Sequence, residues 1–335
     1  MDMVSLSLQP RVSPQRILFA LQAYRDAAVL NTAIELELFT RIAHGADTVN
    51  KIAADLGVPL RGIRLLCDYL TGAGLIIDDG ERLQLADDAA MFLDKHSPSY
   101  LGGAAGTLYS TPLLRGFERL TELVRGRESG SHTTVQPDWF DIARGVTEPA
   151  AAVKTFADAV TFPEGPLKIL DIGGADGAYG IAIAAKYPEA VIVAVDRPAA
   201  LKAAQANAVR AKLKTRYQNV PGDFLAAPFG MDFDAAILAG RFCQLDPPQI
   251  TLLMKRIRDA LKKSGQIVIL DFLTEDTPDF AREYAGFGLT LLTATRRGTA
   301  YSTAEVQDML RSSGYGSIES RRLPAAHATL VTARP

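Results

Sequence analysis

Short runs of β-branched and aliphatic residues alternate with longer helical patterns through the second half of the chain. The runs are LKILDI, VIVAV, FDAAIL and QIVILDFL, which begin at Leu167, Val191, Phe233 and Gln266. Strands that alternate with helices form βαβ units, so their sheet is mostly parallel and helices cover both of its faces. We therefore expect a doubly wound α/β domain over residues 161–335 that ends in a pair of strands, SIESRRL and AHATLVTAR.

The first hundred residues follow a different pattern. TVNKIAADL from Thr48 and LRGIRLLCDYL from Leu60 predict two helices joined by a short turn, and IIDDGERLQLAD is typical of a β-hairpin that turns at Asp79-Gly80. Two helices followed by a hairpin are the order of a winged helix. We expect a winged-helix domain over residues 1–100 and a helical connecting segment over 101–160.

The charge of this N-terminal region argues against DNA binding. Residues 1–100 hold 9 Lys+Arg and 13 Asp+Glu, and the whole chain holds 36 and 38, for a net charge of −2. A protein that reads a DNA duplex needs a positive face to neutralise phosphates. We therefore expect no nucleic-acid partner and interpret the domain as a packing or dimerisation module. A winged-helix regulator that senses a ligand is kept as an alternative.

Cysteine and hydropathy patterns indicate the compartment. The two cysteines, Cys67 and Cys243, form neither a disulfide framework nor a CxxC motif, which fits a reducing cytoplasm. No window approaches the roughly 18 apolar residues that span a bilayer, so no membrane partner is expected. Histidines at zinc-ligand spacing are also lacking, so we expect no metal site. The four histidines are His44, His96, His132 and His327.

The strongest local motif is LDIGGADGAYG, which runs from Leu170 to Gly180. It leads from a buried strand through a glycine-rich turn into a helix that begins near Ala178, and such a turn lets a ligand approach bare backbone at a helix N-terminus. The motif departs from the dinucleotide fingerprint GxGxxG because Ala175 and Ala178 replace its second and third glycines, which disfavours NAD. The candidate ligand-contacting residues are Asp171, Gly173, Gly174 and Gly177.

Two further motifs follow the next strand-like runs. Asp196 comes directly after VIVAV, where a carboxylate can accept both hydroxyls of a ribose, and Arg197 stands beside it. Gly222, Asp223 and Phe224 follow a third run and offer an acid and an aromatic face for a purine. Ligands of doubly wound sheets bind at the carboxyl ends of the strands, so the three motifs predict one nucleoside-binding edge.

These motifs resemble the class I S-adenosylmethionine-dependent methyltransferases, and among them the two-domain small-molecule O-methyltransferases. The resemblance is carried by LDIGGADG, VDRP, GDF and DAAILAGRFCQLD and spans nearly the whole chain. It implies a Rossmann-like domain that binds S-adenosylmethionine and a small, aromatic or natural-product acceptor. It also implies a homodimer formed through the N-terminal winged-helix domain, which closes the substrate pocket of the partner.

The resemblance fails at the expected catalytic base. In the family a histidine after the fourth strand removes a proton from the acceptor hydroxyl, and Cys243 stands at that position. Asp271 fills the position of the acid that holds this histidine, 28 residues later. Ala300 stands where the family has a glutamate. Arg241, two residues before the cysteine, is a candidate anchor for an anionic substrate.

The missing base leaves three interpretations. A phenol has a pKa near 10 and a positioned base contributes about 10²–10⁴-fold, whereas a thiol of ordinary pKa is mostly protonated at neutral pH. Either the acceptor is acidic or already nucleophilic, such as an enol carbon, a thiol or an amine, or another residue such as His132 is the base, or no methyl is transferred. We prefer the first. The aromatic residues Tyr109, Trp139 and Phe140 are candidates for a substrate-facing wall.

Overall fold

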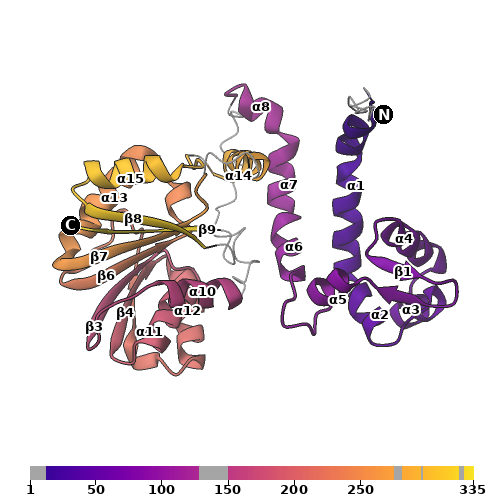
Figure 1. Cartoon of the computed structure of the whole chain (residues 1–335), viewed down its shortest axis with the longest axis horizontal. Coiled ribbons are helices and arrows are strands. Elements are labelled where there is room, and N and C mark those ends of the chain that lie inside the picture. The colour runs from indigo at the N-terminus through magenta and orange to yellow at the C-terminus, as the bar shows by residue number, and fades with distance from the viewer. Residues whose placement is uncertain (1–12, 128–149, 275–280, 296, 324–327) are drawn as a thin grey trace, which may run out of the picture. The chain divides into compact units, whose positions relative to one another are not determined.

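The chain divides into two compact units, which we describe separately from a computed structural model (Figure 1). The units are Met1–Ser110 and Thr111–Pro335. The structure describes residues 13–127, 150–274, 281–295, 297–323 and 328–335.

The first unit is mainly helical. Its elements are α1 Gln15–Glu35, α2 Leu38–Ala43, α3 Val49–Leu56, α4 Leu60–Gly72, β1 Ile76–Asp78, β2 Leu83–Leu85, α5 Asp87–Leu93 and α6 Gly102–Leu108. The expected pair of helices and hairpin is present as α3, α4 and the antiparallel strands β1 and β2. Helix α3 begins where the Thr48 hydroxyl accepts the Lys51 amide, and it ends at Gly57, whose φ is +64°.

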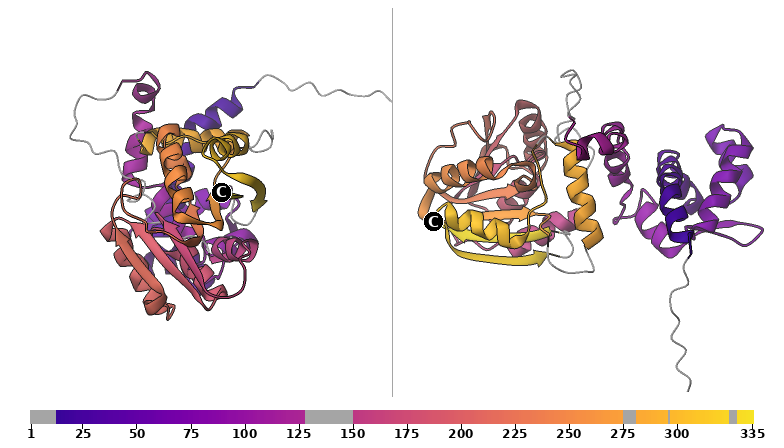
Figure 2. Two further views of the ribbon diagram at one scale, coloured as in Figure 1. Left: turned by 90° about the vertical axis from the view of Figure 1, so that its left-hand side faces the viewer. Right: turned by 90° about the horizontal axis from the view of Figure 1, so that it is seen from above.

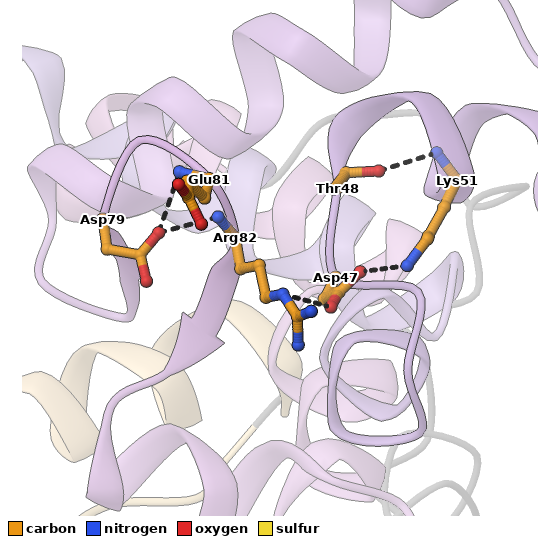
Figure 3. Close-up of polar contacts among 6 residues, drawn as sticks. All are labelled: Asp47, Thr48, Lys51, Asp79, Glu81 and Arg82. Carbon is orange, nitrogen blue, oxygen red and sulfur yellow. Dashed lines mark hydrogen bonds and ion pairs between the residues drawn. The ribbon is translucent and has the colours of Figure 1, made fainter.

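The hairpin is tied to the start of α3 by charged side chains (Figure 3). Asp47 lies 2.6 Å from the Nζ of Lys51 and 3.5 Å from the Nε of Arg82, so one carboxylate joins the helix to the hairpin. Asp79 shapes the turn because its Oδ1 accepts the backbone amides of Glu81 and Arg82. Among the described residues of the first unit, Arg41, Lys51, Arg82 and Lys95 are paired with acids, which is half of its lysines and arginines.

Helix α1 is the longest helix described, with 21 residues. Every residue from 13 to 27 is exposed, including Ile17 at 62%, Leu21 at 68% and Tyr24 at 71%. These three side chains lie at helical spacing and form an apolar stripe. No helix in the described part of the chain is long and apolar enough to cross a membrane.

The second unit alternates strands and helices. Its helices are α7 Thr111–Glu118, α8 Leu120–Val124, α10 Ala150–Ala159, α11 Ala178–Lys186, α12 Pro198–Arg210, η1 Lys214–Arg216, η2 Phe242–Gln244, α13 Pro247–Ala260, α14 Ala281–Ala294 and α15 Thr303–Ser312. Its strands are β3 Leu167–Ile172, β4 Ala190–Asp196, β5 Tyr217–Pro221, β6 Phe233–Ala239, β7 Leu261–Asp271, β8 Gly316–Leu323 and β9 Ala328–Arg334. The part of the expected connecting segment that reads GFERLTELVRG is divided between α7 and α8.

One seven-stranded sheet organises this unit, in the order β5-β4-β3-β6-β7-β9-β8. Strands β3 to β7 are parallel, and β9 and β8 join antiparallel at one edge, where Figure 2 shows them in yellow. The expected doubly wound sheet with a terminal strand pair is confirmed. The chain leaves β3 toward β4 on one side and returns to β6 on the other, so the carboxyl ends of β3 and β6 flank the switch point where ligands of such sheets bind.

Helices cover both faces of the sheet (Figure 1). On one face Ile169 of β3 packs in a core with residues of α10, α11 and α12, including Phe156 and Ile183. On the other face its neighbour Leu170 packs with residues of α13 and α15, including Leu253. Because both faces are buried, the strands read as continuous apolar runs rather than alternating ones. The polar residues that interrupt them therefore gather at the strand ends.

Candidate functional site

The glycine-rich motif forms the loop between β3 and α11. Gly173, Ala175 and Gly177 all have positive φ, at +63°, +51° and +79°. The loop closes where the Gly177 amide donates to the Gly174 carbonyl at 2.8 Å, and α11 begins at Ala178 as the sequence predicts. Backbone is thus brought close to any ligand at the N-terminus of α11.

Asp196 ties this loop to the neighbouring strand. Its carboxylate accepts the amide of Ala175 at 3.1 Å and the amide of Arg197 at 2.7 Å. Its carbonyl accepts the amide of Gly222 at 3.0 Å, so the ends of β4 and β5 are joined as well. The carboxylate oxygens keep further lone pairs for a ligand hydroxyl. The three predicted motifs therefore meet at one edge of the sheet.

The GDF motif follows β5 at this edge. Asp223 is exposed and accepts the amide of Leu225 at 2.9 Å. Phe224 is half-buried against the core, and the guanidinium of Arg256 holds its carbonyl at 2.7 Å. Burial and the neighbouring Arg241 lower the pKa of Arg197 below its ordinary value, and the charge of Asp223 partly offsets this.

Arg241 extends from the end of β6 onto the glycine loop. It is 6% exposed, its Nε donates to the carbonyl of Gly173 at 2.5 Å, and its Nη1 donates to Gln244 at 3.2 Å. A Cβ on Gly173 would lie 2.8 Å from this Nε, so the arginine fits only against a glycine. Arg241 therefore binds the loop directly, a contact that sequence reasoning did not foresee.

Cys243 and Asp271 form a buried pair at the next strand end. One oxygen of Asp271 accepts the amides of Phe242 at 2.8 Å and Cys243 at 3.3 Å, and the other accepts the amide of Phe272 at 2.8 Å. Burial and the adjacent Asp271, to which the thiol donates, raise the pKa of Cys243 well above its ordinary value. Burial also raises the pKa of Asp271, although these donors oppose it. At neutral pH the thiol is a proton donor and not a base.

The segment before α15 packs on this pair. The amide of Thr299 donates to the carbonyl of Cys243 at 2.9 Å, and the Tyr301 hydroxyl donates to the carbonyl of Leu245 at 2.7 Å. Ala300, at the position of the family glutamate, stands half-buried between these two contacts. Alanine carries no group that exchanges protons, so Ala300 cannot serve as an acid or a base at this position.

Other sequence candidates lie elsewhere. Tyr109 follows α6 in the first unit and is half-buried, whereas Trp139 and Phe140 lie outside the described residues, as do His132 and His327. His44 and His96 also belong to the first unit, where their rings are in edge contact at 4.9 Å. Among the described residues no cluster of histidine, cysteine and acidic side chains could hold a metal ion.

Sequence reasoning missed one buried side chain at the site. Tyr217 begins β5, and a Cβ on Gly177 would lie 2.6 Å from its hydroxyl oxygen. This hydroxyl has no hydrogen-bond partner among the described residues, and burial followed by the nearby Asp171 raises its pKa. Tyr217 is the first residue of the run that precedes GDF, and nothing in the sequence around it indicates a role at the site.

The described residues fit S-adenosylmethionine. Bare backbone at Gly173 and Gly174, beside the unpartnered buried carboxylate of Asp171, suits the zwitterionic amino-acid end. Asp196 suits the ribose hydroxyls, and the half-buried ring of Phe224 suits the adenine. The polar and apolar parts of this edge thus follow the order of the ligand's groups.

Comparison with known proteins points to one family. Residues 150–316 match the model of an O-methyltransferase domain. A 3-hydroxy-5-methyl-1-naphthoate 3-O-methyltransferase of Streptomyces sahachiroi is 27% identical, with 91% of this chain and 90% of that protein aligned. The N,N-dimethyltransferase OxyT of Streptomyces rimosus is 26% identical over 82% of each chain. The crystal structure of a candidate O-methyltransferase from Nostoc punctiforme superposes with a TM-score of 0.90 at 30% identity, covering 97% of this chain and 100% of that one.

Proposed function

The chain belongs to the S-adenosylmethionine-dependent O-methyltransferase family, and from this premise we propose that it methylates a small aromatic or natural-product acceptor whose nucleophilic atom needs no base from the protein. The Cys243–Asp271 pair carries the proposal. A thiol that donates to a buried carboxylate cannot take a proton from the acceptor. The proposed acceptor is therefore acidic or already nucleophilic, such as an ionised hydroxyl, an enol carbon, a thiol or an amine.

The cofactor residues are proposed from their placement at one edge of the sheet. Gly173, Gly174 and Gly177 present backbone to the amino-acid end, near Asp171, and the remaining groups hold the nucleoside. These are Asp196 with Arg197 at the ribose, and Asp223 with Phe224 at the adenine. Bound S-adenosylmethionine supplies a methyl group already activated by its sulfonium, so aligning the acceptor provides much of the rate.

Arg241 favours an anionic acceptor. Its guanidinium donates to the glycine loop and to Gln244, the residue that follows Cys243. A planar guanidinium binds carboxylates and phenolates by charge-assisted hydrogen bonds, and it also stabilises the ionised form of a hydroxyl. The hydroxynaphthoate in the name of one relative has both a carboxylate and a hydroxyl. The OxyT name indicates amine methylation, which needs no strong base.

We also propose a homodimer that forms through the first unit. The apolar stripe of α1 supports it, because monomeric proteins rarely expose contiguous apolar surface of this kind. Tyr109, Trp139 and Phe140 stay candidates for the acceptor wall. The acidic balance of the first unit continues to disfavour the DNA-binding alternative.

The first experiment separates cofactor binding from catalysis. Calorimetric titration with S-adenosylmethionine and S-adenosylhomocysteine should show micromolar binding that Asp196→Ala weakens at least tenfold. Asp308→Asn is the matched control because that carboxylate lies on α15 and pairs with Arg311 on the surface. Absence of binding to the wild type would contradict the proposal.

The second experiment tests the acceptor class. Formation of S-adenosylhomocysteine is followed with phenols of decreasing pKa and with an aromatic amine. Turnover at pH 7 should rise as the phenol pKa falls toward about 7, because the protein does not remove the proton. Equal turnover across the phenol series would reveal a base. Binding without turnover of any acceptor would favour a homologue that has lost methyl transfer.

A further inference from the structure

Asp171 is a buried carboxyl group without a partner. It is the fifth residue of β3, paired in register with Ala194 of β4 and Ile237 of β6, and it is 1% exposed. Neither of its oxygens has a hydrogen-bond partner among the described residues. A buried, unpaired carboxylate is costly, so such a group tends to hold its proton.

The glycine motif encloses this carboxyl group. A Cβ on Gly174, in the loop, would lie 2.5 Å from its Oδ2, and a Cβ on Gly180, in the first turn of α11, would lie at the same distance. The Tyr217 hydroxyl lies under the same loop, beside Gly177. Asp171 is therefore held directly beneath the backbone on which the amino-acid end of the cofactor is proposed to rest.

The charges that surround Asp171 oppose its ionisation. Asp196 on β4 and Asp176 in the loop are acidic, Tyr217 on β5 is neutral, and Arg241 after β6 is the one cation that acts on it among the described residues. Arg241 donates to the Gly173 carbonyl and not to Asp171. Burial, followed by the charge of Asp196, raises the pKa of Asp171 to about 7, and Arg241 only partly offsets this.

We propose that Asp171 exchanges a proton for the ammonium group of the cofactor, so that binding of the amino-acid end is linked to proton release. The inference rests on the proposed function. Asp171 is the neutral acid in the free protein, and its proton passes to solvent when a cation occupies the loop above it. An opposite charge within about 4–6 Å lowers the pKa of an aspartate by about 1–3 units, which is enough to ionise it at neutral pH.

The sign of the linkage follows from this change. Because the free form holds more protons than the bound form, affinity is highest above the free-state pKa and falls as the pH decreases below it. The dissociation constant for S-adenosylmethionine should rise up to about tenfold per pH unit between about pH 7 and 5. 5′-Methylthioadenosine, which keeps the nucleoside but lacks the ammonium group, should bind without this dependence.

Proton release is measured by calorimetry in two buffers that differ in ionisation enthalpy. At pH 7 the wild type should release about half a proton per bound S-adenosylhomocysteine. Asp171→Asn, which keeps the shape but cannot ionise, should release none. The surface control Asp308→Asn should behave like the wild type, because it does not remove the exchanging group.

Infrared spectroscopy of the free protein tests the starting state directly. At pH 6 the carbonyl band of a protonated carboxylic acid should be present, should disappear on addition of S-adenosylhomocysteine, and should be missing from Asp171→Asn. An ionised Asp171 in the free protein at pH 6 would overturn the inference. Tight binding with equal proton release in Asp171→Asn would overturn it too, while leaving the proposed function intact. Absence of any binding would refute both.

Discussion

At the scale of single residues, Cys243 is held beside Asp271 as a protonated thiol, which can donate a proton but does not accept one. In the family pattern the acid orients a histidine that accepts a proton, whereas here the acid receives a hydrogen bond from a thiol. Three backbone amides already hold the Asp271 carboxylate. If Cys243 stands at the position of the family base, as we propose, the acid is held in place without that base, and the chemistry depends on the acceptor.

Removing the thiol should therefore have little effect on the reaction. We expect Cys243→Ala and Cys243→Ser to keep turnover within about threefold of the wild type, with an unchanged pH profile, because a protonated thiol is not a base. Steady-state kinetics with the best acceptor measures this. Cys67→Ala, which removes a buried thiol of the first unit, controls for loss of packing. A loss beyond about a hundredfold in both Cys243 variants would assign the thiol a chemical role.

At the scale of elements, the turn between β3 and α11 joins three strands. Gly177 has a φ of +79°, and its missing side chain leaves room for the Tyr217 hydroxyl and for the Cβ of Ala204 on α12. The left-handed backbone and the tight packing therefore both require glycine at position 177. The Asp196 carboxylate accepts the amide of Ala175 in this turn, so a shift of the turn would also move the proposed ribose-binding carboxylate.

Gly177→Ala should weaken both the fold and cofactor binding. The left-handed conformation and the 2.6 Å approach to Tyr217 together should cost about 2–4 kcal/mol of unfolding free energy. Denaturant unfolding and calorimetric titration measure the two effects. Gly45→Ala is the matched control, because Gly45 has a φ of +102° but no atom within 4 Å of the added Cβ. Equal losses in the two variants would show that the contact with Tyr217 is unimportant.

The strand ends of this unit are predictable from sequence because both faces of the sheet are buried. The runs LKILDI and FDAAIL lie within β3 and β6, and polar residues stand near their carboxyl ends, Asp171 within the first run and Arg241 three residues after the second. Contacts made across the loop are not predictable in this way. The packing of Arg241 on Gly173, 68 residues away, depends on where β6 lies beside β3. The contact between Tyr217 and Gly177 also depends on the arrangement of the strands, so the pattern of residues along the chain does not predict it.

At the scale of the whole molecule, the N-terminal part of α1 is left exposed by the described chain, whereas its last residues pack in the core of the first unit. Its residues 13–27 are exposed on every side, and isolated helices of this length are marginal in water. Burial of a Leu or Ile side chain contributes about 1.5–3 kcal/mol. A second copy of the chain that covers the stripe of Ile17, Leu21 and Tyr24 would stabilise the helix, which is why the homodimer proposal depends on it.

Charges placed in this stripe should separate the protomers. We expect the double variant Ile17→Asp, Leu21→Asp to sediment as a monomer at micromolar concentration where the wild type sediments as a dimer, because association would bury two unpaired carboxylates per protomer. Gln22→Asp adds a charge to the same exposed helix outside the stripe and should leave the dimer intact. Cofactor affinity, which depends on residues of the second unit, should not change in either protein. A wild type that sediments as a monomer would refute the dimer, and a double variant that remains dimeric would place the interface away from α1.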